Sequence, residues 1–389
     1  MSSLDTRNPL QYDVEKVQIL DEDGTVRDDA EVPDLSDEKL LEMYRMMLLG
    51  RYIHESAEFY HKQGLGLYPT LAGQEAHVAA AYALDDDDWM YEYGREGPAM
   101  IAHGYSMDKY ALRWTGNEAG NVTPEGVSVS PYDVSVGAHI LRAVGCAWAH
   151  DIKGQNASSL VFFGDGATSQ GTFHEALNFA GVLDLPTVFM CNNNQWAIST
   201  PFEKQSASRT IAQRAVAYDV PGVLVDGMDP LAVYQVTKEA IDRAKNPDDG
   251  DPRPTLIESL QYRYGAHSVI DDADVYRNDD HWEEEEEWKE KDSLPRMETF
   301  LTERDILDED LKEELQAEVK EEWDEAVEIA NETPKPDPRV LFENVFEEPT
   351  WNLHEQYEEL ERYLEEFGEK AILEASAREW EFEEMSHIG

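Results

Sequence analysis

Basic residues are scarce in this chain of 389 amino acids, which has 32 lysines and arginines against 83 aspartates and glutamates, for a net charge of −51. Such a surface repels nucleic acid and anionic membranes, and we expect neither as a partner. The acidic residues are spread among aromatic and aliphatic ones, as in LDDDDW and WEEEEEWKEKD, whereas a disordered acidic tail would concentrate them. The composition therefore predicts a folded protein with an acidic surface adapted to high salt, where screening relieves the self-repulsion.

Cysteine is nearly absent, and no hydrophobic run is long. Cys146 and Cys191 are the two cysteines, each in an apolar stretch, and we expect free thiols rather than a disulfide. No apolar run approaches the ~20 residues needed to span a bilayer. The N-terminal MSSLDTRNPLQYD lacks the basic start and the apolar segment of a signal peptide. These features predict a cytoplasmic protein.

Composition and periodicity divide the chain into three expected parts. Residues 1–35 are polar and acidic and are expected to form an arm. Residues 36–282 begin with helical segments at 36–63 and 73–84, and then alternate helical patterns with short apolar runs such as SLVFFGDG, TVFMCNN, PGVLVDGMD and TLIESLQYRY. This alternation predicts an α/β fold with a doubly wound parallel sheet and helices on both faces. Residues 283–389 are rich in glutamate and helical in pattern, and are expected to pack on this domain or on another subunit.

Two polar motifs follow neighbouring apolar runs: GDGATSQG at 164–171 and NNN at 192–194. In an open parallel sheet, ligands bind beyond the carboxyl ends of the strands. The interval from Asp165 to Asn194 is 194 − 165 = 29 residues, enough for one helical crossover between parallel strands. The glycines beside Asp165 let a backbone approach a ligand, and the helix N-terminus that follows favours an anion. An aspartate, an asparagine and phosphate-binding amides together predict a Mg²⁺–diphosphate site.

Two other interpretations of these motifs are open: a purely structural role, and a different class of enzyme. Each motif alone fits an ordinary β–α turn in which Asp165 caps a helix. A Mg²⁺-dependent phosphotransferase or phosphatase would also use Asp165, but the Asp165-Gly166-Ala167 stretch offers no second nearby carboxylate. The P-loop pattern GxxxxGK[ST] is absent, which excludes that class of nucleotide site.

The segment GDGATSQGTFHEALNFAGVLDLPTVFMCNNNQWAISTP resembles the thiamine-diphosphate motif of a known family. The family comprises the α subunits of the E1 components of 2-oxo acid dehydrogenase complexes, which include the pyruvate and branched-chain enzymes. The resemblance runs from Leu40 to Glu348 and includes GLYPTLAGQEA, GREGPAMIAHG, PEGVSVSPYDVSVGAH, LVDGMDPLAVY and YRYGAHSVIDD. It implies a thiamine diphosphate-binding fold, with Mg²⁺ and thiamine diphosphate as cofactors. The implied activity is oxidative decarboxylation of a 2-oxo acid, with transfer of the acyl group to the lipoyl group of E2.

The resemblance also implies which residues bind the metal and the diphosphate. Asp165 and Asn194 would bind Mg²⁺ through side-chain oxygens, and Trp196 through its backbone carbonyl. Gly166 and Ala167 would offer backbone amides to the diphosphate.

Arg95 matches the arginine that pairs with the diphosphate in the family, a role that suits its fixed fork of donors. The sequence departs from the family beside it. Where the family commonly has a tyrosine, this chain has Gly94, with Tyr93 one position earlier. The resemblance therefore leaves the phosphate contact of that tyrosine open.

Further roles concern the thiamine rings and the substrate. Val136 matches the segment that touches the aminopyrimidine through its backbone, and Ile198 matches the apolar residue that holds the cofactor bent. His267 matches the loop histidine near the thiazolium, which orients or protonates intermediates of the reaction. Leu67 and Tyr68 fall where the family lines the 2-oxo acid pocket.

His267 lies in YRYGAHSVIDDADVYR, a polar stretch expected to form a loop over the site. Arg263 and Arg277 are expected to anchor this loop. The loop also contains three aspartates: Asp271, Asp272 and Asp274. Their charges are expected to favour the protonated imidazolium of His267.

One part of the implied machinery is missing from the chain. The glutamate that protonates the aminopyrimidine in the family belongs to the β subunit, and the sequence has no second thiamine-type domain. We therefore expect an obligate α₂β₂ assembly with active sites at the α/β interfaces. The substrate stays open between pyruvate, branched-chain 2-oxo acids and acetoin. A non-catalytic subunit that binds Mg²⁺ and diphosphate is a further alternative.

Overall fold

The computed structural model describes residues 15–343, 345–368 and 370. The chain divides into two compact units between Thr333 and Pro334. The expected arm before residue 15 and the expected C-terminal helix after residue 370 lie outside the described residues. Within the described residues, no helix is both long enough and apolar enough to cross a membrane.

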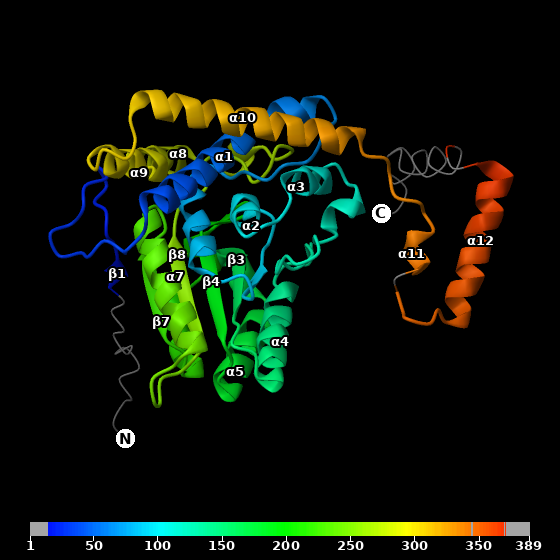
Figure 1. Cartoon of the computed structure of the whole chain (residues 1–389), viewed down its shortest axis with the longest axis horizontal. Coiled ribbons are helices and arrows are strands. Elements are labelled where there is room, and N and C mark those ends of the chain that lie inside the picture. Colours follow the sequence, from blue (N-terminus) through cyan, green and yellow to red (C-terminus); the bar gives the residue numbers. More distant parts are fainter. Residues whose placement is uncertain (1–14, 344, 369, 371–389) are drawn as a thin grey trace, which may run out of the picture. The chain divides into compact units, whose positions relative to one another are not determined.

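A parallel sheet of six strands forms the centre of the first unit (Figure 1). Its strand order is β1-β7-β8-β4-β3-β2, and every neighbouring pair is parallel. The strands are β1 (Lys16–Val17), β2 (Trp89–Tyr91), β3 (Ser159–Gly164), β4 (Thr187–Asn193), β7 (Gly222–Asp226) and β8 (Thr255–Leu260). This confirms the parallel α/β sheet predicted from the alternating apolar runs.

Helices cover both faces of the sheet, and their side chains make two separate cores. Along β3, Leu160 and Phe162 point into one core, whereas Val161 and Phe163 point into the other. The first core is covered by α1 (Asp37–Lys62), the 3₁₀ helix η1 (Glu75–Ala83), α7 (Pro230–Lys245), α9 (Ser293–Thr302) and α10 (Glu309–Glu332). The second is covered by α4 (Ala138–Lys153) and α5 (Gly171–Leu183). Burial on both faces explains why every residue of β4 is buried.

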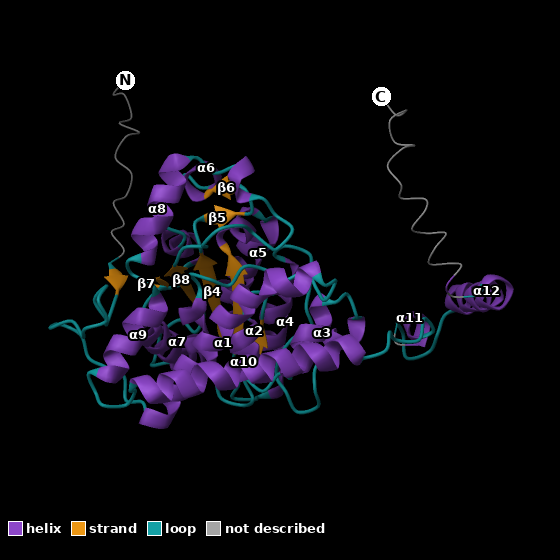
Figure 2. Ribbon diagram, turned by 90° about the horizontal axis from the view of Figure 1, so that it is seen from above, coloured by secondary structure: helices purple, strands orange, loops and turns teal. Residues whose placement is uncertain are grey.

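Shorter elements connect these layers, and helices of the first unit flank the strands in Figure 2. They are α2 (Gly97–Ala102), α3 (Met107–Trp114), η2 (Glu118–Asn121), η3 (Asp165–Ser169), α6 (Phe202–Gln205), η4 (Ala212–Tyr218), η5 (Ala273–Val275) and α8 (Asp279–Lys289). A small antiparallel hairpin joins β5 (Trp196–Ala197) to β6 (Thr200–Pro201). The two cysteines are free thiols, as expected.

Segments at both ends of the first unit pack against the rest of it. Before residue 36, β1 pairs with β7, and the amides of Ile19 and Leu20 donate to Asp229 at 2.6 and 2.7 Å. After residue 282, α9 and α10 pack into the first core, where Trp323 is buried. The second unit contains α11 (Val340–Glu343) and α12 (Trp351–Phe367). Arg339, directly before α11, forms an ion pair with Glu361 of α12 at 2.8 Å.

Candidate active site

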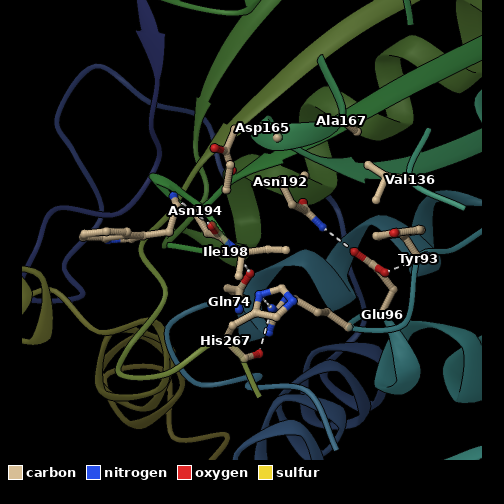
Figure 3. Close-up of a pocket in the computed structure, with 15 residues that line it drawn as sticks. Gln74, Tyr93, Glu96, Val136, Asp165, Ala167, Asn192, Asn194, Ile198 and His267 are labelled. Carbon is tan, nitrogen blue, oxygen red and sulfur yellow. Dashed lines mark hydrogen bonds between the residues drawn. The ribbon is translucent and has the colours of Figure 1, made fainter. Parts of the chain in front are cut away.

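A cavity of about 230 Å³ lies at the carboxyl ends of β3 and β4 (Figure 3). It is lined by Gln74, Tyr93, Arg95, Glu96, Val136, residues 164–167, Asn192, Asn194, residues 196–198 and His267. Every residue to which the resemblance assigns a role in binding the metal or the cofactor lies in this lining. The strand pairing explains the convergence, because Gly164 of β3 is the register partner of Asn192 of β4.

Asp165 follows β3 directly and is almost fully buried, with 1% of its surface exposed. No hydrogen-bond donor among the described residues reaches its Oδ2 atom. Burial is the main cause that raises the pKa of this carboxyl from 3.8 to about 7, against the smaller opposing effects of Arg263 and Arg95. A buried carboxylate oxygen without a donor is costly, so the site is suited to a positively charged ligand.

Asn194 follows β4 directly and is held at both ends of its carboxamide. Its Oδ1 accepts a hydrogen bond from the amide of Trp196 at 3.2 Å, and its Nδ2 donates to Oε1 of Gln74 at 2.7 Å. The side chains of Asn194 and Gln74 are both buried. The asparagine oxygen therefore has a fixed direction beside Asp165 in the lining of the same cavity.

The hairpin after β4 approaches the turn after β3 closely. A Cβ atom at Gly166 would lie 2.9 Å from Cβ of Ala197, so a larger residue does not fit at this position. The hairpin also carries Ile198, which has a φ of +56°. A β-branched residue in the left-handed region is strained, and here the strained turn leaves Ile198 at the cavity with 55% of its surface exposed.

Arg95 reaches across the cavity to the loop that carries His267. Its Nη1 donates to the carbonyl of Thr70, and its Nη2 donates to the carbonyl of His267 at 3.0 Å. The residue before it, Gly94, has a φ of +100°, and a Cβ there would lie 3.1 Å from the ring of Trp114. The glycine is thus required by the backbone conformation.

Tyr93, one position before that glycine, lines the cavity. Its ring stacks on His139 with centroids 5.1 Å apart, and its hydroxyl donates to the carbonyl of Val134 at 3.1 Å. Val134 and Val136 are exposed near it. Tyr93 therefore borders the cavity, although it stands one position before the place where the family commonly has its tyrosine.

His267 is neutral in this environment, and the expectation of a protonated imidazolium is wrong. Its Nδ1 lies 2.8 Å from Nη2 of Arg95. Burial, together with Arg95 and Arg263, lowers the pKa of the imidazole to about 3. The carboxylate of Asp271 binds the backbone amide of His267 at 2.6 Å instead of the ring. Because arginine can only donate, Nδ1 is the acceptor and Nε2 carries the proton.

The loop around His267 is anchored by both arginines, as predicted. Arg263 donates to the hydroxyl of Tyr276 at 3.0 Å, and that hydroxyl donates to Asp271 at 2.5 Å. Arg277 donates to the carbonyl of Arg263 at 2.9 Å and forms a buried ion pair with Glu285. These contacts fix the loop against α8.

Comparison with known proteins agrees with this geometry. The family model described as "Dehydrogenase E1 component" matches residues 44–339. The chain belongs to the dehydrogenase E1 component family. It is 41% identical over 354 residues to the pyruvate dehydrogenase E1 component subunit alpha of Staphylococcus aureus (strain Mu50), which covers 90% of this chain and 94% of the relative. The corresponding subunit of Staphylococcus epidermidis (strain RP62A) is 40% identical over the same shares of both chains.

The two residues expected at the substrate pocket of this E1 chain do not line the cavity. Tyr68 is fully buried, packs edge-on against Trp323 at 5.9 Å, and donates to the carbonyl of Leu65 at 3.1 Å. Leu67 is half-exposed. This placement gives no support to a substrate contact by either residue within this chain.

The sequence-based assignment missed three polar residues of the E1 site: Gln74, Glu96 and Asn192. Glu96 is buried and accepts hydrogen bonds from Nδ2 of Asn192 and from the amide of Tyr93, both at 2.9 Å. Gln74 and Glu96 stood inside motifs quoted for the resemblance, next to recognised positions. Their contacts join segments far apart in the chain, which the spacing of a motif does not reveal.

Proposed function

We propose that this E1 chain is the α subunit of a 2-oxo acid dehydrogenase E1 enzyme that depends on thiamine diphosphate and Mg²⁺. The observation that carries the proposal is the buried carboxylate of Asp165, which has an unpartnered oxygen in a cavity shared with Asn194. The names of the relatives favour pyruvate among the possible substrates. Acetoin and branched-chain 2-oxo acids are the alternatives.

The donors in the cavity fit Mg²⁺. Mg²⁺ takes about six oxygen ligands and shares them with phosphates. Asp165 and Asn194 would supply side-chain oxygens, and Trp196 a backbone carbonyl. No cluster of three or more His, Cys, Asp or Glu side chains among the described residues could hold a metal ion alone, so the donor set is one that a diphosphate would complete. A divalent cation would also offset the burial of Asp165 and lower its pKa.

The diphosphate would lie against the turn after β3. Gly166 and Ala167 would offer backbone amides, and the close approach of Ala197 to Gly166 explains the glycine. Arg95 uses Nη1 and Nη2 to bind Thr70 and His267. Since arginine has five N–H groups, it retains donors at Nε and Nη1 for a phosphate.

Thiamine diphosphate, when bound, supplies a nucleophilic carbon and an electron sink for decarboxylation. Ile198 and Val136 would support its rings from the exposed rim of the cavity. His267, which is neutral, would donate a hydrogen bond from Nε2 to an oxygen of the substrate. Arg95 keeps this tautomer by donating toward Nδ1. The histidine thus acts as an orienting donor near neutral pH.

We propose that the chain works as an α₂β₂ assembly and passes the acyl group to a lipoyl-bearing E2. The described residues contain one large parallel sheet, with the cavity at the carboxyl ends of its inner strands β3 and β4. The glutamate that acts on the aminopyrimidine would come from the β subunit, and the exposed side chains of Val136 and Ile198 would lie near that subunit.

A substrate panel tests the proposal. The chain would be co-expressed with its β subunit and assayed with pyruvate, branched-chain 2-oxo acids and acetoin, with a lipoyl domain as acceptor. We expect pyruvate to be used best, and only with Mg²⁺ and thiamine diphosphate present. Use of acetoin alone would support the acetoin alternative, and cofactor binding without turnover of any substrate would support a non-catalytic subunit.

A further inference from the structure

Gln74 is a buried residue of the cavity to which neither the family resemblance nor the proposed function gives a role. It precedes η1, and 1% of its surface is exposed. Its Oε1 accepts from Nδ2 of Asn194 at 2.7 Å, and its Nε2 donates to the carbonyl of Thr70 at 3.2 Å. Figure 3 shows Gln74 between Asn194 and His267.

The hydrogen bonds fix the direction of both carboxamides. The carbonyl of Thr70 can only accept, so it faces the nitrogen of Gln74 and leaves Oε1 toward Asn194. The amide of Trp196 can only donate, so it faces Oδ1 of Asn194. Neither carboxamide can be turned over without placing two donors or two acceptors against each other. The network therefore has one consistent arrangement.

We propose that Gln74 is a positioning residue that presents the oxygen of Asn194 to Mg²⁺. If the Asn194 carboxamide were rotated by about 180°, its NH₂ group would point at the cation, and the cation would repel the amide hydrogens. Gln74 provides the acceptor that holds this NH₂ group away from the metal. The inference rests on the proposed function, because it requires that Asn194 binds Mg²⁺.

Hydrogen bonds that orient a ligand residue affect how tightly the site binds its metal ion. Loss of the partner that orients a ligand costs about 10–100-fold in metal affinity. The Gln74→Met substitution keeps the length of the side chain and removes both hydrogen bonds. Gln74→Glu keeps an acceptor for Asn194 and, because burial favours the protonated carboxyl, a donor for the carbonyl of Thr70. We expect the methionine variant to bind Mn²⁺ about 10–100-fold more weakly and the glutamate variant to retain most of the affinity.

The measurement uses Mn²⁺ in place of Mg²⁺, with the full chain assembled with its β subunit and saturating thiamine diphosphate. Free Mn²⁺ is counted by electron paramagnetic resonance, so the result does not depend on activity. If Gln74→Met does not fold, Gln74→Asn, which withdraws the same amide by one methylene, gives a second test with the same expected loss.

Gln261→Met is the matched control. Gln261 is also fully buried, and its Nε2 donates to Oδ1 of Asn192 at 2.9 Å. The substitution removes the same kind of amide-to-amide hydrogen bond at the same edge of the sheet, but from an asparagine with no proposed metal contact. We expect Gln261→Met to lower thermal stability and to leave Mn²⁺ affinity unchanged. An equal loss of Mn²⁺ affinity in this control would overturn the specific role of Gln74.

A double-mutant cycle with Asn194→Ala separates this inference from the proposed function. If Asn194→Ala alone leaves Mn²⁺ affinity unchanged, the metal site itself is wrong. If Asn194→Ala weakens binding but Gln74→Met does not, the role of Gln74 alone is wrong. When Gln74 acts through Asn194, adding Gln74→Met to Asn194→Ala has no further effect on affinity. A penalty that persists in full in the double variant contradicts the proposal.

Discussion

Replacing Asp165 by asparagine should stabilise the cofactor-free protein while it abolishes cofactor binding. The carboxyl is buried, and its Oδ2 has no donor among the described residues. The substitution keeps the shape of the side chain and removes the charge that burial penalises. A residue that destabilises the apo fold in this way is expected where the charge serves a ligand.

The magnitude follows from the pKa of Asp165, which burial raises from 3.8 to about 7. For an acid whose pKa is raised in the folded state, stability is fully present below the unfolded pKa and is lost as the pH rises through the folded pKa. At 1.36 kcal/mol for each pH unit, the raised pKa of Asp165 lowers the free energy of unfolding by about 4 kcal/mol at pH 8 and by about 2 kcal/mol at pH 5.5, where the folded protein mostly keeps the proton. Asparagine does not titrate, so the advantage of Asp165→Asn should grow by about 2 kcal/mol across this range.

Denaturant unfolding of the apo protein at both pH values, at one fixed salt concentration, measures this difference. The lower pH stays above the pI of about 4.3, which limits aggregation. In a separate thermal unfolding experiment, addition of Mg²⁺ and thiamine diphosphate should raise the Tm of the unchanged chain and leave the Tm of Asp165→Asn unchanged. A variant that is less stable than the unchanged chain at pH 8, or that keeps the ligand-induced shift, would refute the reasoning.

Four further outcomes are expected. His267→Ala should leave thiamine diphosphate affinity nearly intact, because Arg95 keeps its bonds to backbone carbonyls. It should lower the rate of a single turnover by about 10²–10³, the effect of removing one positioned hydrogen-bond donor; lost affinity would make the histidine a cofactor ligand. Because the pKa of His267 is lowered to about 3, the activity profile should show no step near pH 6.5 that disappears in His267→Ala. Asn194→Ala should weaken Mg²⁺ binding less than Asp165→Ala, since a neutral ligand is lost, and a calorimetric comparison decides this. The Tm should rise with molar salt, given the net charge of −51; a flat salt series would contradict the proposed salt adaptation.

The sequence predicted the sheet and the two strand ends because these depend on local signals. Short apolar runs mark β3, β4 and β7, which are six, seven and five residues long, and a glycine turn or an asparagine run lies at the end of each. Two parallel strands joined by one helix are neighbours, so Asp165 and Asn194 were expected to converge. The structure pairs β3 with β4 and places both residues in one cavity.

The electrostatics of His267 could not be predicted from sequence, because the deciding neighbour is distant along the chain. Arg95 lies 172 residues away and faces the imidazole, whereas Asp271, only four residues away, binds the backbone. The burial of Tyr68 could not be predicted either, because it depends on Trp323 of α10, which is distant along the chain. Proximity in sequence indicates which groups share a loop, but packing decides which of them face each other.

Calorimetric titration of the α/β assembly with thiamine diphosphate, with and without Mg²⁺, tests the central claim most directly. The account predicts one site for each chain, binding that requires Mg²⁺, and no binding to an assembly that carries Asp165→Ala. Binding of equal strength without Mg²⁺, unchanged binding to the Asp165→Ala assembly, or no binding to the unchanged assembly would contradict it.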